Sequence, residues 1–351
     1  MSYIISGIQQ VGIGVIDAEK AWTWYRKNFD MDVPVFKDAA EAKLMTRYTS
    51  GKVESRYAIL AINMHGGGGF EIWQYTSKTL LKGAVDYTLG DTGIYATKLK
   101  SHAIAEKYHD LKAKGATLLT EVGEAPDGRK HFFVSDPYGN IFEIIESTSW
   151  FKLGKSKNGG VAGCVIGVSD IDKSIPLYRD VLGYTQVYDT TNVHHDLTGV
   201  PGGGNKIRRV LLRGTQSGKG NFGRLLGTTE IELVQVLDRT PHKMFADRNW
   251  GDLGFIHVCF DVNGMKALAA KAAQAGFPFT VDSSTSFDMG KAAGQFTYIE
   301  DHDGTLIEFV ETHKIPILEK MGLYLSLKNR NPEKPLPNWM VGMLALNRVK
   351  D

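Results

Sequence analysis

Apolar and polar positions along the chain predict one small structural unit written four times. Each copy opens with an apolar run typical of a buried strand, continues with a helix-period segment and closes with two or three strands. In the first copy we expect a strand over 8–15, a helix over 17–29 and strands over 56–62 and 70–75. Repetition of a whole supersecondary unit is a property of the architecture, so it fixes the fold class before any single residue is interpreted.

The copies also resemble one another in sequence, the first with the third and the second with the fourth. The matching segments are GIGVID at 12–17 with VIGVSD at 165–170, GDTG at 90–93 with GDLG at 251–254, and DPYGNIFE at 136–143 with DHDGTLIE at 301–308. This internal similarity serves as an alignment and places equivalent positions of the four copies side by side.

Local signals support the predicted helices. Asp17 is a suitable N-cap for the first helix, and Gly115 and Gly276 are placed to end the second and fourth. The third copy carries an insertion over 193–205, which we expect to be a surface loop and a candidate lid. In the tail, Asn338 is a candidate cap for a short apolar helix that docks on the body or on a second subunit.

The chain has 351 residues, which suits two domains of about 150 residues each. We therefore expect one domain over 1–150, a second over 158–313 and a helical tail over 314–351. Within the two domains the predicted modules cover 5–80, 90–149, 160–238 and 250–313.

Composition narrows the class of protein. The formal net charge is +2 and no long basic run is present, so we expect neither a nucleic-acid partner nor a membrane surface. No apolar stretch reaches the ~18 residues of a membrane helix, and no signal peptide is recognisable. Cys164 and Cys259, the two cysteines, lie in apolar strand patterns. A reducing, cytoplasmic setting is therefore expected, with a small-molecule substrate and a monomeric or homodimeric state.

Carboxylates recur at one place in all four copies. A glutamate inside an apolar strand is costly unless it is paired or bound to a metal. Aligning the copies gives four pairs, each with an opening-strand and a closing-strand position: Gln10 and Glu71, Ala96 and Glu143, Gly163 and Glu232, and His257 and Glu308. Four glutamates in register predict a shared structural or metal-binding purpose.

Through these strand–helix copies and the endings at Glu143 and Glu308, the chain resembles the vicinal oxygen chelate superfamily over about residues 5–312. That superfamily includes glyoxalase I, methylmalonyl-CoA epimerase, extradiol dioxygenases and bleomycin-resistance proteins. The resemblance implies an α+β fold of four βαβββ modules in two domains with curved mixed sheets. It also implies one metal between two copies, each giving an opening-strand ligand and a closing-strand carboxylate.

The position of the metal depends on which copies pair. Pairing the first with the fourth supplies Gln10, Glu71, His257 and Glu308, which fill every position and suit zinc, nickel, cobalt, manganese or iron. Pairing the second with the third leaves Ala96, Glu143, Gly163 and Glu232, without opening-strand ligands. Pairing the third with the fourth gives Gly163, Glu232, His257 and Glu308, with one vacancy. We favour the first pairing; in the remaining alternative, His257 is a core histidine and the glutamates are relics.

Other residues in or near these strands are candidates for a place in the site. Cys259 shares a strand face with His257 and is expected to be a small buried hydrophobe. Gly12 and Gly14 would leave room for substrate beside a metal. His194 and His195, in the insertion, are expected at the loop surface.

Some charged and aromatic side chains are candidates for ligand contacts. Arg208, Arg209 and Arg213 either anchor an anionic substrate group or form a solvated strand edge. Trp22, Trp24 and Trp73 offer stacking surfaces for a ligand, although core packing is the more common use of tryptophan.

These observations lead to a hypothesis about the reaction. A metal holding two adjacent substrate oxygens would stabilise the enediolate formed when a proton leaves the carbon beside a carbonyl. Glu71 and Glu308, on opposite sides of the metal, would exchange the roles of base and acid, as in glyoxalase-type isomerisation or epimerisation. The alternatives are an extradiol-type dioxygenase, for which a second histidine is missing, and a non-catalytic protein that binds a small molecule.

Overall fold

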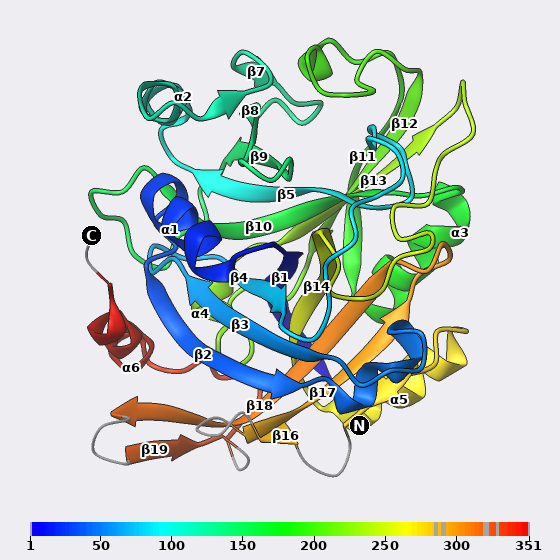
Figure 1. The fold of residues 1–351 in the computed structure, drawn as a ribbon. Coiled ribbons are helices and arrows are strands. Elements are labelled where there is room, and N and C mark those ends of the chain that lie inside the picture. The colour runs from blue at the N-terminus through cyan, green and yellow to red at the C-terminus, as the bar shows by residue number, and fades with distance from the viewer. Residues whose placement is uncertain (1, 284–286, 289–292, 319–322, 328–329, 350–351) are drawn as a thin grey trace.

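Two curved mixed sheets form the fold, an α+β architecture with few helices, as the repeats predict (Figure 1). The computed structural model describes residues 2–283, 287–288, 293–318, 323–327 and 330–349. None of the described helices is long and apolar enough to cross a membrane.

The first copy follows the predicted order, with its strands longer than expected and one strand added after the helix. Asp17 caps the helix by accepting a hydrogen bond from the Lys20 amide. The elements are β1 (Ile4–Gly14), α1 (Ala18–Phe29), β2 (Val33–Glu41), the 3-10 helix η1 (Lys43–Tyr48), β3 (Ser55–Ile62) and β4 (Gly69–Tyr75).

The second copy ends its helix where Gly115 adopts a left-handed backbone conformation, with φ +76°. Glycine takes this conformation without steric cost, so the predicted helix stop is confirmed. The elements are β5 (Gly93–Ser101), α2 (Ile104–Ala113), β6 (Thr117–Leu118), β7 (Gly123–Glu124), β8 (Lys130–Ser135) and β9 (Ile141–Glu146).

The third and fourth copies repeat the pattern, and the third has extra short helical turns. Its elements are β10 (Asn158–Gly167), α3 (Ile171–Pro176), η2 (Leu177–Val181), β11 (Tyr184–Asn192), η3 (His195–Leu197), β12 (Ile207–Gly214), α4 (Gly223–Leu226) and β13 (Glu230–Val236). The fourth contains β14 (Gly254–Asn263), α5 (Met265–Gln274), β15 (Val281–Asp282), β16 (Phe287–Asp288), β17 (Ala293–Glu300) and β18 (Leu306–Leu318).

Each sheet joins one copy from each half of the chain. The ten-stranded sheet runs β15-β17-β18-β14-β1-β4-β3-β2 and combines the fourth copy with the first, orange and blue in Figure 1. The nine-stranded sheet runs β11-β12-β13-β10-β5-β9-β8-β6 and combines the third with the second. The seams are the antiparallel pairs β1–β14 and β5–β10. Our segment boundaries at 150 and 158 stay a prediction, since the sheets cross them.

The closing turns that the second and fourth copies share each bind a tyrosine from a helix of another copy. In the second copy, the Asp136 carboxylate of the closing turn accepts a hydrogen bond from Tyr25 on α1 at 2.7 Å. In the fourth copy, Asp301 accepts one from Tyr178 on η2 at 3.3 Å. Around the first contact, the rings of Tyr25, Phe142 and Phe255 pack in one aromatic core. The turns therefore tie the helix of one sheet to the closing strand of the other.

The tail packs on the body of the protein. Its strand β19 (Leu323–Ser326) pairs with β18, and α6 (Asn338–Gly342) precedes η5 (Met343–Asn347). Val341 and Leu336 pack in one cluster with Val33 of β2. Asn338 does not cap the helix as expected: Pro337 holds the N-cap position, and Asn338 is the first helical residue.

Asp261 on β14 gives the ten-stranded sheet a pH-sensitive position. The residue is 1% exposed, and its Oδ2 atom has no hydrogen-bond partner among the described residues. Burial raises the pKa of this carboxyl from 3.8 to about 7, against the nearby Ser6 side chain, which lowers it. The folded protein therefore holds a proton here that the unfolded chain releases.

We expect the free energy of unfolding to fall as pH rises from about 4 to 7, because only the unfolded state has ionised Asp261 in that interval. The full contribution is at most about 4 kcal/mol. Asp261→Asn should remove this part of the pH dependence and make the protein more stable above pH 7, as urea denaturation at several pH values would measure. Asp86→Asn, at a carboxylate 93% exposed, is the control. Parallel pH profiles for the native protein and Asp261→Asn would contradict the assignment.

Candidate metal centre

Glu71, His257 and Glu308 meet on one face of the ten-stranded sheet. They come from β4, β14 and β18, which lie close together because β1 pairs with both β4 and β14, and β14 with β18. The His257 Nε2 atom lies 3.0 Å from Glu308 Oε2 and 3.3 Å from Glu71 Oε2. Within the part of the chain that the structure describes, no other group of three histidine, cysteine or acidic side chains has ligand atoms within 4.8 Å of one another.

Gln10 on β1 completes the set predicted from the sequence. Its Nε2 atom donates a hydrogen bond to Glu71 Oε2 at 3.3 Å, and its side chain is buried. The Gln10 Oε1 atom has no partner among the described residues. The structure thus brings Gln10, Glu71, His257 and Glu308 together.

Several buried polar atoms in this cluster lack a directed hydrogen bond. Among the described residues, neither ring nitrogen of His257 nor Oε2 of Glu308 has an aligned partner, although these groups are in close contact. Burying polar atoms without hydrogen bonds costs about 1–3 kcal/mol each. Unpartnered nitrogen and oxygen atoms facing one another are what a divalent cation would satisfy, so the residues present fit a metal.

The charges of the cluster are strongly coupled. Burial lowers the pKa of His257, but the Glu308 and Glu71 carboxylates outweigh it and raise the pKa to about 9. Burial raises the pKa of Glu71, but His257 and the charge of Arg56 lower it by a larger amount, so the net effect is a decrease. Glu71 is therefore a carboxylate at neutral pH, and His257 carries a balancing proton without a metal.

Gly12 leaves room for the histidine, which corrects our expectation that it leaves room for substrate. A Cβ atom on Gly12 would lie 2.4 Å from His257 Cε1. A Cβ atom on Gly14 would lie 2.0 Å from the Asp252 carbonyl oxygen. Both positions require glycine because the neighbouring β14 segment fills the space.

Aromatic rings enclose His257. The Trp250 ring stacks on it with centroids 6.5 Å apart, and Tyr298 meets it edge-on at 5.6 Å. Trp73, next but one to Glu71, contacts Trp250 at 4.3 Å. Cys259 is buried, and burial and the charge of Glu308 raise the pKa of its thiol, so a neutral thiol occupies that position.

The equivalent place in the nine-stranded sheet is filled by an ammonium group. Lys98 on β5 lies 3.0 Å from Glu143 and 2.6 Å from Glu232, the two closing-strand carboxylates. All three side chains are at most 1% exposed. Ala96 and Gly163 supply no ligand, as expected. Lys98 is therefore a built-in cation in the position equivalent to the centre of the Glu71, His257 and Glu308 cluster.

Other side chains from the insertion and β12 close this second cluster. Arg209 binds Glu232 at 2.6 Å and Asp196 at 2.7 Å, and Asp196 also lies 3.4 Å from His131. The insertion thus covers the nine-stranded sheet. It does not form a lid over Glu71, His257 and Glu308, which are called the triad below. The expectation of an anion anchor is wrong for Arg208, Arg209 and Arg213, because all three pair with carboxylates of the protein.

The remaining candidate residues lie in the core or at the surface, away from the triad. His194 is half-buried beside Asp196, and His195 is exposed. Trp22 is buried in the main core, and Trp24 packs against it. Sequence reasoning missed Lys98 and Trp250. Lysines alternating with apolar residues at 98 and 100 were a signal for internal cations, whereas no sequence signal placed Trp250 beside His257.

Comparisons with known proteins agree with this architecture. A proposed dioxygenase from Bacillus subtilis subsp. subtilis str. 168 is 15% identical, with 88% of this chain and 86% of that chain covered and a TM-score of 0.59. Glyoxalase I from Zea mays is 15% identical, with 88% and 92% covered and a TM-score of 0.53. Identities this low show the fold alone. The search of curated proteins found no match.

The sequence itself matches a family described as the Glyoxalase/Bleomycin resistance protein/Dioxygenase superfamily, over residues 7–144 and 160–309. These two segments cover most of the chain and contain the strands of both sheets that carry the clusters described above. The chain belongs to the Glyoxalase/Bleomycin resistance protein/Dioxygenase superfamily.

Proposed function

We propose that the protein is a metal-dependent enzyme that moves a proton at the carbon beside a carbonyl group, in an isomerisation, lyase or epimerisation reaction. The observation that carries this proposal is the cluster of Glu71, His257 and Glu308, in which both ring nitrogens of His257 and Oε2 of Glu308 are buried without an aligned partner among the described residues.

The ligands would be Gln10 Oε1, a carboxylate oxygen from Glu71 and Glu308, and His257 Nε2. One imidazole with three oxygen donors suits a divalent ion such as zinc, nickel, cobalt, manganese or iron. When bound, such an ion supplies Lewis-acid stabilisation of two adjacent substrate oxygens.

Glu71 and Glu308 would carry the proton. Each presents an Oε2 atom to the same nitrogen of His257, at 3.3 and 3.0 Å, so both carboxylates border the same site. The lowered pKa of Glu71 keeps it ready to accept a proton. Trp250 and Tyr298 restrict water around His257, which strengthens electrostatic interactions inside the site.

The donor set favours proton transfer over ring cleavage. An iron(II) oxygenase uses two histidines and one carboxylate on one face. The cluster here has one histidine and two carboxylates. A second carboxylate suits a reaction that needs both a base and an acid.

The test uses metal-loaded protein in D₂O with the hemithioacetal of methylglyoxal and, separately, an epimerisable thioester. We expect product, or returned substrate, that carries deuterium at the carbon beside the carbonyl. Catechol cleavage by the iron-loaded protein would instead support the dioxygenase alternative. Tight binding of an unchanged planar ligand to metal-free protein would support the binding-protein alternative.

His257→Ala is expected to abolish stoichiometric metal binding. The native protein should hold about one metal per chain, since Lys98 occupies the second cluster. Loss of a direct ligand should weaken binding by more than the roughly 10–100-fold caused by loss of a supporting contact. Metal content after dialysis measures the effect. His302→Ala, at an exposed histidine, is the matched control, and equal metal content in both variants would refute the site.

A further inference from the structure

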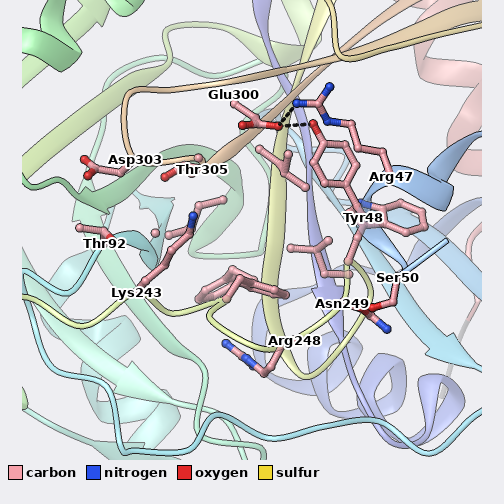
Figure 2. Close-up of a pocket in the computed structure, with 18 residues that line it drawn as sticks. Arg47, Tyr48, Ser50, Thr92, Lys243, Arg248, Asn249, Glu300, Asp303 and Thr305 are labelled. Atoms are coloured by element: carbon pink, nitrogen blue, oxygen red, sulfur yellow. Dashed lines mark hydrogen bonds and ion pairs between the residues drawn. The ribbon is translucent and has the colours of Figure 1, made fainter.

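A cavity of about 370 Å³ lies near the triad of Glu71, His257 and Glu308, at the ends of both sheets. Figure 2 shows Arg47, Tyr48 and Glu300 on one side of it and Thr92, Lys243 and Asp303 on the other. Its volume is in the range of small-molecule sites. None of the triad residues lines it.

Trp250 separates this cavity from the triad. It lines the cavity and also stacks on His257, with an angle of 18° between the rings. Its backbone is fixed on both sides, because its amide donates to the Tyr48 carbonyl at 2.9 Å and its carbonyl accepts from the Tyr75 hydroxyl. The indole therefore stands between the cavity and the proposed reaction centre.

The indole N–H of Trp250 lacks an acceptor. The residue is 6% exposed, and among the described residues Nε1 has no hydrogen-bond partner. A buried tryptophan N–H is normally satisfied. An oxygen of a bound ligand would supply the missing acceptor.

The cavity walls carry three cationic side chains, Arg47, Lys243 and Arg248, and two carboxylates, Glu300 and Asp303. Glu300 accepts hydrogen bonds from Arg47 and Tyr48, and Asp303 accepts one from the Ser169 amide. Lys243 forms no ion pair with any described residue. Its backbone is nevertheless held, by a bridge to Thr92 at the start of β5.

Arg248 adds a second positive charge. Its guanidinium donates to the backbone carbonyls of Leu253 and Met244, and it has no carboxylate in ion-pair contact among the described residues. The ring of Phe245 lies under it at 4.3 Å. Burial lowers the pKa of this arginine by more than Tyr87 and the charge of Asp252 raise it.

We propose that this cavity binds a small organic anion, a carboxylate or a phosphate, with Lys243 as the charge that recognises it. The apolar walls formed by Ile94, Phe255 and Leu306 would enclose the flat body of that molecule, and Trp250 would be the wall between it and His257. This binding site is separate from the proposed reaction centre, because none of the three residues Glu71, His257 and Glu308 lines the cavity.

The experiment measures binding and needs no turnover. Benzoate, phenyl phosphate and the neutral isostere benzamide are titrated into the metal-loaded protein, with tryptophan fluorescence and calorimetry as readouts. We expect both anions to bind more tightly than benzamide. Lys243→Ala should weaken anion binding by about 10-fold, corresponding to about 1.4 kcal/mol, and leave benzamide binding unchanged. Lys266→Ala, at an exposed lysine on α5, is the matched control.

Trp250→Phe gives a second, independent readout. It keeps an aromatic ring but removes the indole, so the fluorescence change on anion binding should disappear while calorimetry still detects binding. The proposal is overturned if neither anion binds, if Lys243→Ala and Lys266→Ala behave alike, or if benzamide binds as tightly as benzoate. Anion binding by a protein that exchanges no substrate proton would instead refute the proposed reaction and keep the cavity assignment.

Discussion

Replacing Glu308 by glutamine is expected to lower turnover by about 10²–10⁴-fold while the metal stays bound. Glutamine keeps the size of the side chain and an oxygen donor, but it cannot accept the substrate proton, and general-base catalysis typically supplies a factor of this size. Glu308 Oε2 is the carboxylate oxygen closest to His257, at 3.0 Å, so its loss removes the base nearest the proposed reaction centre.

Deuterium exchange at the substrate carbon and metal content, measured on the same preparation, separate the two effects. Glu143→Gln is the positional control, because Glu143 occupies the equivalent closing-strand place in the other sheet and binds Lys98. Folded Glu143→Gln should keep full exchange activity. Full activity in Glu308→Gln would exclude Glu308 as the base.

Lys98→Met is expected to reduce the free energy of unfolding by about 3–5 kcal/mol, because removing one partner leaves buried charges of the other sign uncompensated. Burial lowers the pKa of Lys98, but Glu143 and Glu232 outweigh it and raise the pKa, so its ammonium is charged at all ordinary pH values. Without it, both carboxylates remain buried, and among the described residues they keep Arg209 and His131 as cationic partners. Urea denaturation measures the loss.

Lys100 provides a matched control on the same strand. It is also fully buried, but its partners within the described part of the chain are the carbonyls of Ser149 and Leu226, and burial lowers its pKa to about 7. Lys100→Met removes a largely uncompensated cation and should cost much less. Equal losses for Lys98→Met and Lys100→Met would show that Lys98 does not serve as an internal counter-ion.

The sequence predicted the architecture because internal repetition substitutes for an alignment. In the first copy, the helix expected over 17–29 and the strands expected over 56–62 and 70–75 are found within one residue of those bounds. Asp17 and Gly115 start and end helices as proposed. The four residues Gln10, Glu71, His257 and Glu308 could be selected because each occupies an equivalent place in its copy. Their roles as ligands and as acid and base stay predictions.

Individual side-chain contacts between segments far apart in the chain were mostly not predictable, although the pairing of the first copy with the fourth was. The use of Gly12 depends on the ring of His257, which lies across the seam between two strands. Arg209 looked like a surface charge, but the insertion supplies Asp196 to cover it. Trp250 lies in a linker without strand or helix pattern, so only the folded structure places it between the cavity and His257.

The seam between β1 and β14 joins segments about 250 residues apart in sequence, and this has a consequence during synthesis. When the first half of the chain leaves the ribosome, β1 and β5 each have a partner on one side only, because β14 and β10 do not yet exist. Two open strand edges invite pairing with other chains. Contacts this distant in sequence also form slowly. The nascent protein therefore passes through an aggregation-sensitive interval that ends only when the fourth copy docks and completes the candidate metal centre.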